Sequence, residues 1–194
     1  MIWIKLCGMR SRADVAAAEA AGADAVGFVT AAGSVRRVTA LEAAEYGEGC
    51  SVERFLVTTD ETPEDLLLAA RASRVTGVQP HGRHGSEAAA AAIEAGYRVL
   101  FPVPVSADID TTAVPEGALP IFDGAVPGSG TGFDPALIST FPGRYVVAGG
   151  LTPDNVGDIL TELRPYGVDV SSGIERERGV KDPVLMRRFV EAVR

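Results

Sequence analysis

The sequence predicts an α/β protein, a single (β/α)8 barrel over residues 1–194 in which the fifth helix is reduced to a loop. Short apolar runs alternate with alanine-rich amphipathic runs along the chain, a pattern typical of strand–helix units around a parallel sheet. A recurring order of helix end, glycine and strand marks three units, at 20–28, 94–101 and 165–172. Eight strands favour a closed barrel of the TIM type, and a doubly wound open sheet is the alternative.

The strands are expected in short apolar runs that are rich in β-branched and aromatic residues. In chain order these runs are 2–7, 23–29, 52–59, 75–79, 97–101, 118–123, 144–149 and 167–171.

The helices are expected where a capping residue precedes an amphipathic stripe. Ser11 and Asp14 form a capping-box pattern, Pro63 occupies a first helical position, and Gly22 can end a helix. Prolines and the lack of a helical stripe favour a loop over 102–118. The expected helices are 12–21, one after Thr39, one from Thr62, 86–95, a short one near 134–140, one from 152, and 183–193.

The composition describes an ordered, acidic chain. Hydrophobic residues make up 46% and charged residues 23%, which argues against disorder. The net charge is −8, and no basic cluster is long enough to predict nucleic-acid binding. Cys7 and Cys50 do not make a disulfide framework, so we expect a cytoplasmic setting. The sequence predicts no signal peptide and no membrane span. Lysine occurs only at Lys5 and Lys181, which we interpret as a composition bias.

Candidate catalytic groups follow the strands, because barrel active sites lie at the carboxyl ends of the strands. Cys7 ends the first strand and Asp123 ends the sixth. A thiolate can act as a base if positive potential lowers its pKa, and burial can keep a carboxylic acid protonated. The structural alternatives are a buried apolar cysteine and an aspartate that caps a helix.

Candidate anion sites lie in three further loops. The glycine-rich turns at 148–151 and 170–175 suit a phosphate, because backbone N–H groups can approach it closely, or they are simply tight turns. Arg36 and Arg37 can bind a carboxylate through paired hydrogen bonds, or they can form a solvated basic turn. His81 can line the site or have no role. Two histidines without the usual spacings give no metal motif.

The ordered set of motifs resembles the phosphoribosylanthranilate isomerases of tryptophan biosynthesis, from the first strand to the last helix. The motifs are "KLCGMR" (5–10), "GVQPHG" (77–82), "FDGAVPGSGTGFD" (122–134), "VVAGGLTPDNV" (146–156) and "GVDVSSGIERERGVKD" (167–182). The resemblance implies a TIM barrel whose fifth helix is a loop. It also implies an Amadori rearrangement of N-(5'-phosphoribosyl)anthranilate to 1-(2-carboxyphenylamino)-1-deoxyribulose 5-phosphate, without cofactor or metal.

The resemblance assigns a role to each site residue. Cys7 becomes the general base, Asp123 the general acid and Arg36 the partner of the anthranilate carboxylate. Asp169 either lines the site or is a carboxylate hydrogen-bonded inside the barrel. The expected substrate contacts are Arg36, Gln79, His81 and Asp169, and the expected phosphate contacts are Gly128, Gly130, Gly149, Gly150, Ser172 and Gly173.

The sequence departs from the family pattern at several positions. Val35 replaces the proline of the second loop, which leaves open whether Arg36 or Arg37 binds the carboxylate. Pro80 replaces a leucine and removes a backbone donor. The glycines after Asp123 align in two ways, as 128–130 or as 130–132.

Two other functions remain as alternatives. A related isomerase of the histidine pathway, or a barrel serving both pathways, uses an aspartate where Cys7 stands. A catalytically inactive barrel that binds phosphorylated sugars or a partner enzyme would be favoured by loss of Cys7 or Asp123, but both are present. We expect a monomer rather than a dimer, acting on a small phosphorylated sugar–anthranilate, with no nucleic-acid or membrane partner.

Overall fold

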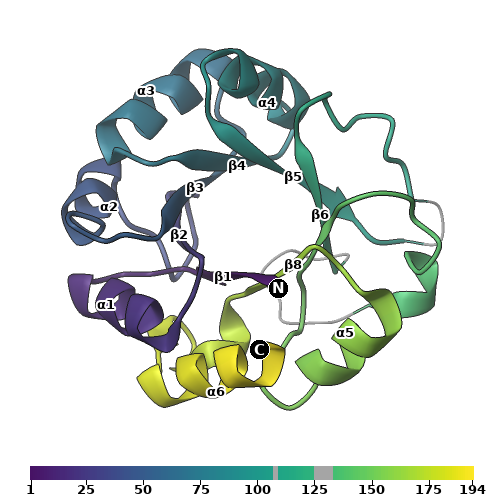
Figure 1. Cartoon of the computed structure of the whole chain (residues 1–194). Helices are drawn as coiled ribbons and strands as arrows, with labels where there is room; N and C mark the ends of the chain where they lie inside the picture. Colours follow the sequence, from purple (N-terminus) through teal and green to yellow (C-terminus); the bar gives the residue numbers. More distant parts are fainter. Residues whose placement is uncertain (107–108, 125–132) are drawn as a thin grey trace.

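A closed eight-stranded parallel barrel forms the centre of the computed structural model, which describes residues 1–106, 109–124 and 133–194 (Figure 1). The strands follow one another around the barrel in chain order, and β1 also pairs with β8, with Lys5 opposite Asp169. The open-sheet alternative is therefore wrong. The barrel strands are β1 Trp3–Cys7, β2 Ala25–Val29, β3 Glu53–Thr59, β4 Gly77–His81, β5 Arg98–Pro104, β6 Leu119–Asp123, β7 Val146–Val147 and β8 Gly167–Val170.

Alternation along the strands divides the core into two parts. Ile4 and Leu6 of β1 belong to the large apolar cluster that also contains buried residues of the helices. Trp3 belongs to a second cluster, with Phe55 and Ile121, that fills one end of the barrel. Lys5 and Cys7 share the strand face of Trp3, so β1 carries an apolar layer, a charged layer and the thiol in succession.

The helices surround the barrel, and α1 and α6 lie side by side (Figure 1). Ser11 caps α1, and its hydroxyl accepts from the N–H of Asp14 at 3.1 Å. The Asp14 carboxylate accepts from the N–H of Arg10, one residue before the reciprocal capping-box position. The helices are α1 Arg12–Ala21, α2 Ala40–Tyr46, α3 Pro63–Ser73, α4 Gly85–Glu94, α5 Val156–Leu163 and α6 Pro183–Val193.

The fifth strand continues past the predicted end at residue 101, as far as Pro104. Its pairing with β6 persists to Pro104 opposite Asp123, whereas pairing with β4 stops at Val78 opposite Val99. The N–H of Val105 donates to the carbonyl of Asp123 in β6. Successive residues of a strand direct their backbone groups to opposite neighbours, so the backbone of Pro102 and Pro104 faces β4. Their missing N–H groups therefore fall where no ladder forms, and the prolines end the pairing without breaking the strand.

A proline also lies on β4, in the part of that strand that no longer pairs with β5. The carbonyl of His81 accepts from the N–H of Asp60, which follows β3, so the backbone of His81 faces β3. The backbone of the preceding residue, Pro80, therefore faces β5. A cavity of about 420 Å³ opens here between the ends of the two strands, with His81 and Phe101 among its lining residues. The described residues between β5 and β6 form turns and no helix, so the predicted loss of the fifth helix is confirmed.

The short helix expected near 134–140 forms as the 3-10 helix η1 Pro135–Leu137, which is shorter than the expected range. Phe141 precedes Pro142, which disfavours helical backbone and leaves too few residues for an α-helix. Phe141 instead packs edge-on against Phe122, with ring centroids 5.0 Å apart.

The helix expected from residue 152 begins only at Val156. The side chain of Asn155 accepts from the N–H of Thr152 and donates to the carbonyl of Gly150, so it fastens the preceding loop instead of capping the helix. The last loop contains elements that the sequence did not predict: the 3-10 turn η2 Ser172–Ile174 and an antiparallel hairpin, β9 Glu175–Glu177 with β10 Val180–Lys181.

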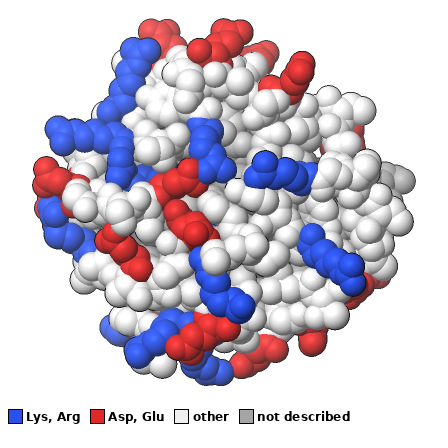
Figure 2. Space-filling view, in the orientation of Figure 1, with Lys and Arg blue, Asp and Glu red and all other residues white. Residues whose placement is uncertain are grey.

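The surface mixes charges of both signs. Figure 2 shows acidic and basic side chains interspersed on one face of the barrel. Within the described ranges, no helix combines the length and apolar character needed to cross a bilayer.

Candidate active site

A cavity of about 200 Å³ opens at the carboxyl ends of the strands. Residues of β1, β4, β6 and β8 line it together with the loop after β2, so the barrel closure unites groups far apart in the sequence. Six of the predicted site residues line this one cavity, namely Cys7, Arg36, Gln79, His81, Asp123 and Asp169.

Cys7 is 6% exposed at the end of β1. A side chain at Gly27 of β2 would come within 2.6 Å of the Cys7 sulfur, so this glycine makes room for the thiol. Burial raises the pKa of the Cys7 thiol, and the charges of Lys5 and Lys181 act in the opposite direction. The positive groups that a thiolate base needs are thus present, but desolvation outweighs them in the free protein.

A buried charged layer lies directly below Cys7. The Lys5 ammonium is fully buried and donates to Asp169 Oδ1 at 3.0 Å and to Gln79 Oε1 at 3.0 Å. Burial lowers the pKa of Lys5, but Asp169 and Cys7 outweigh this effect and raise it, so the ammonium stays charged. Asp169 both lines the cavity and is hydrogen-bonded inside the barrel, so the two predicted alternatives hold together.

His81 is held in its neutral form. Burial lowers its pKa to about 4, and the charge of Lys5 contributes. Its Nε2 lies 3.2 Å from Gln79 Nε2. A neutral imidazole can exchange hydrogen bonds with a polar substrate, but it brings no positive charge to an anion at neutral pH.

Asp123 ends β6, where its Oδ1 accepts from the N–H of Gly124 at 2.8 Å. Burial raises the pKa of Asp123 to about 6, and the charge of Asp169 adds to the effect. A side chain at Gly149 would come within 2.7 Å of Asp123 Oδ1, so the loop after β7 approaches the carboxyl closely because residue 149 is glycine. Asp123 can therefore hold a proton near neutral pH.

This raised pKa predicts how stability depends on pH. The fold binds the Asp123 proton more tightly than the unfolded chain does, with a pKa of about 6 against an ordinary 3.8. The resulting stabilisation is complete below the lower value and is lost as pH rises through the higher one. Asn at position 123 cannot ionise. We therefore expect the Asp123→Asn variant to gain up to about 3 kcal/mol in free energy of unfolding, relative to the wild type, between pH 3.5 and pH 7.

Urea unfolding of both proteins across this pH range measures the difference directly. Carboxyl groups that do not interact with Asp123 titrate in both proteins and cancel. A difference that stays constant with pH would contradict the raised pKa of Asp123.

A smaller cavity of about 50 Å³ lies beside Asp123, between the loops after β7 and β8. Gly149, Gly150 and Ser172 line it. Both glycines have positive φ, 86° and 66°, and no described residue accepts a hydrogen bond from their backbone N–H groups. Gly173 stands just outside the lining, where a side chain would collide with the carbonyl of Leu151, so its role is to let the two loops pack together. The predicted contacts Gly128 and Gly130 lie outside the described residues.

The two candidate arginines differ in environment. Arg36 is 7% exposed and donates from Nε and Nη2 to Glu175, at 2.6 and 2.8 Å. Arg37 is exposed, and its Nε donates to the carbonyl of Thr30 at 3.3 Å. Only Arg36 lines the cavity, so the geometry favours Arg36 as the carboxylate partner.

Lys5, Glu175 and Lys181 are buried charged residues of the site region that sequence reasoning missed. Both lysines are buried at the site, with side chains 0% exposed. Our interpretation of the lysine pattern as a composition bias therefore overlooked a signal. A chain that uses arginine everywhere else keeps lysine at the two positions where a compact ammonium fits between buried acceptors.

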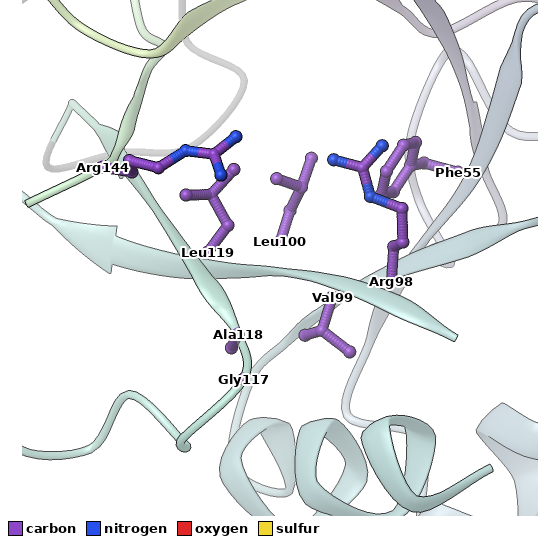
Figure 3. Close-up of a pocket in the computed structure, with 8 residues that line it drawn as sticks. All are labelled: Phe55, Arg98, Val99, Leu100, Gly117, Ala118, Leu119 and Arg144. Carbon is purple, nitrogen blue, oxygen red and sulfur yellow. The ribbon is translucent and has the colours of Figure 1, made fainter. Parts of the chain in front are cut away.

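A larger cavity of about 360 Å³ lies elsewhere, at the starts of β5 and β6. In Figure 3, the guanidinium groups of Arg98 and Arg144 point toward one another above Leu100 and Leu119. Arg98 pairs with Glu53, and Arg144 lies 3.9 Å from the ring centroid of Tyr166. None of the predicted site residues lines this cavity, which is at the end of the barrel that serves stability in such folds.

The fold and the site together define a (β/α)8-barrel enzyme with a thiol, a carboxyl group of raised pKa and a small glycine-lined cavity at one mouth. The chain belongs to the N-(5'-phosphoribosyl)anthranilate isomerase family, which it matches over residues 4–192. It is 40% identical to the isomerase of Deinococcus radiodurans, covering 98% of this chain and 96% of the relative.

Two solved relatives support the same assignment. A dimeric phosphoribosylanthranilate isomerase of Thermotoga maritima, solved as monomers, superimposes with a TM-score of 0.86 at 30% identity, covering 99% of this chain and 98% of the relative. An isomerase in complex with reduced 1-(o-carboxyphenylamino)-1-deoxyribulose 5-phosphate gives a TM-score of 0.85 at 29% identity, with the same coverage. The resemblance predicted from the motifs is confirmed. The chain is an isomerase of tryptophan biosynthesis that catalyses the Amadori rearrangement of phosphoribosylanthranilate.

Proposed function

We propose that this chain isomerises N-(5'-phosphoribosyl)anthranilate with Asp123 as the general acid and Cys7 as the general base. The observation that carries this proposal is their placement in one cavity, at the ends of β1 and β6. The protonation state of Asp123 also fits its role. The acid must hold a proton near neutral pH, and the pKa of Asp123 is about 6.

The first step opens the furanose ring. Asp123 gives its proton to the ring oxygen as the bond between that oxygen and C1' breaks. The lone pair of the anthranilate nitrogen forms the new C=N bond, which leaves a protonated Schiff base and an Asp123 carboxylate. Burial disfavours the charged carboxylate in the free site, so Asp123 holds this proton until the ring opens.

The second step removes the C2' proton. The Cys7 thiolate takes this proton, and the electrons of the C–H bond move toward the positively charged Schiff base to give an enolamine. Tautomerisation of the enolamine at C2' gives the ketone product. Lys5 and Lys181 favour the thiolate that this step needs, against the cost of burying it.

The two ends of the substrate require separate anion sites. We assign the phosphate to the small cavity beside Asp123, where the backbone N–H groups of Gly149 and Gly150 are available and Ser172 lines the wall. We assign the anthranilate carboxylate to Arg36. Gln79, His81 and Asp169 line the same cavity, where they can contact the rest of the substrate. Gly128 and Gly130 remain predicted phosphate contacts.

Arg36→Ala is expected to raise KM at least tenfold more than Arg37→Ala does. A charge-assisted hydrogen bond contributes about 1.5–3 kcal/mol, and only Arg36 lines the cavity. Steady-state kinetics of both variants measures the two effects side by side, with Arg37→Ala as the matched control. The reverse order would move the carboxylate site to Arg37.

We further propose that the enzyme acts as a cytoplasmic monomer without nucleic-acid or membrane partners. Both cysteines are free, as is typical of a reducing compartment. Among the described residues, the large apolar side chains that are exposed each come from a different helix, turn or loop, at Met1, Val35, Leu41, Leu68, Leu137 and Val184. Scattered apolar residues are ordinary on the surface of a monomer.

Turnover of phosphoribosylanthranilate generated in situ tests the proposed function, with the histidine-pathway aminoaldose as a parallel substrate. We expect activity on the first substrate alone. Activity on both would support the dual-substrate alternative and would show that Cys7 does not exclude the aminoaldose. A folded protein that converts neither would be an inactive phosphate-binding barrel.

A further inference from the structure

The last loop places a buried carboxylate between two cations at the mouth of the barrel. Glu175 accepts from Arg36 through Nε and Nη2, from Lys181 Nζ at 2.8 Å and from the N–H of Gly179 at 3.0 Å. Its side chain is 3% exposed, and that of Lys181 is 0% exposed. Burial acts to raise the pKa of Glu175, but these partners lower it to about 2, so the group is a carboxylate throughout the working range.

The geometry of the guanidinium group gives this contact a consequence for the substrate. Arginine presents five N–H donors in one rigid plane. Glu175 takes the edge formed by Nε and one hydrogen of Nη2, so the edge formed by Nη1 and the second hydrogen of Nη2 is left. No described residue accepts from this second edge, and Arg36 lines the catalytic cavity. Holding one edge of a planar group fixes the direction of the other.

Lys181 supplies the charge that this arrangement needs. Arg36 and Glu175 alone would form a neutral pair, with little attraction for an incoming carboxylate. With Lys181 the cluster carries a net charge of +1. Burial lowers the pKa of Lys181, and the charge of Glu175 opposes this. A side chain at Gly8 would come within 2.7 Å of Arg36 Cδ and 3.3 Å of Lys181 Nζ, so this glycine lets the cluster pack beside Cys7.

We propose that Glu175 and Lys181 are positioning residues for the substrate carboxylate. Glu175 aims the free edge of Arg36 into the cavity, and Lys181 keeps the cluster positive. This inference rests on the proposed function, in which Arg36 binds the anthranilate carboxylate.

Binding of two probes tests the inference. One probe is reduced 1-(o-carboxyphenylamino)-1-deoxyribulose 5-phosphate, and the other is the same compound without the carboxyl group. We expect Glu175→Gln and Lys181→Met each to bind the carboxylated probe about tenfold more weakly, and the other probe as the wild type does. In Glu175→Gln, KM for the substrate should rise while kcat changes little. Lys181→Met is compared by probe binding alone, because Lys181 also favours the Cys7 thiolate. Glu177→Gln, on the exposed part of the same hairpin, is the matched control.

The direction in which Glu175→Gln changes the affinity for the carboxylated probe distinguishes a role in orienting Arg36 from a purely electrostatic role. Removing this negative charge raises the cluster to +2, so a purely electrostatic role predicts tighter binding of the carboxylated probe. Tighter or unchanged binding, or equal loss for both probes, would overturn the inference. Lys181→Met provides an independent test if Glu175→Gln fails to fold.

Arg36→Ala distinguishes failure of the inference from failure of the proposed function. If Arg36→Ala leaves binding of the carboxylated probe unchanged, the proposed carboxylate site is wrong. If Arg36→Ala weakens binding and Glu175→Gln does not, only the inference is wrong. Because Glu175 acts through Arg36, the double variant Arg36→Ala with Glu175→Gln should bind the carboxylated probe no more weakly than Arg36→Ala alone.

Discussion

Asp123→Asn is expected to lower kcat by about 10²–10⁴-fold, the usual contribution of a positioned general acid. Asn has nearly the same shape, and its carbonyl can still accept from the N–H of Gly124, so the loop after β6 keeps its contact. Asn has no acidic proton to give to the ring oxygen. Steady-state turnover of phosphoribosylanthranilate measures the loss.

Binding of the reduced product analogue serves as the control for Asp123→Asn. An unchanged affinity would show that the cavity is intact and that the loss lies in proton transfer. Turnover within a few-fold of the wild type would remove Asp123 from its role as the acid.

Cys7→Ala is expected to lower kcat by a similar factor, about 10²–10⁴-fold. Alanine fills part of the same buried position and leaves the Lys5, Gln79 and Asp169 layer below it in place. Lys5 stays protonated and so cannot replace the thiolate as a base, and the Asp169 carboxylate is held in its ion pair with Lys5. Steady-state kinetics of the purified variant measures this effect.

Cys50→Ala is the matched control, because Cys50 is the second free thiol and does not line the catalytic cavity. It should keep wild-type turnover. Near-normal turnover of Cys7→Ala would mean that another group removes the C2' proton.

The sequence allowed the barrel to be predicted because each strand–helix unit carries its own local signals. Gly22 has the positive φ of 91° that its place after the first helix requires, and Pro63 begins α3 as expected. The failures lie where tertiary contacts override such signals. Pro102 and Pro104 looked like strand breakers, but they lie in β5 because the neighbouring β4 has stopped pairing there.

Some residues of the candidate site could likewise be placed from local sequence signals, and others depend on tertiary contacts. Cys7 and Asp123 could be placed at the mouth from their positions at strand ends, as could Gly149 and Gly150. Glu175 could not, because its partners Arg36 and Lys181 come from another loop and from the far strand of a short hairpin. The environment of Cys7 was equally hidden, since the balance between burial and nearby ammonium groups depends on packing.

The central claim is that Asp123 acts at the ring oxygen and Cys7 acts at C2'. The most direct test compares turnover of phosphoribosylanthranilate carrying hydrogen or deuterium at C2', in the wild type and in both variants. The account predicts a large primary isotope effect in Cys7→Ala, where removal of the C2' proton limits the rate. It predicts an effect near unity in Asp123→Asn, where ring opening limits the rate. The reverse pattern, or no isotope effect in Cys7→Ala, would contradict the assignment of the two roles.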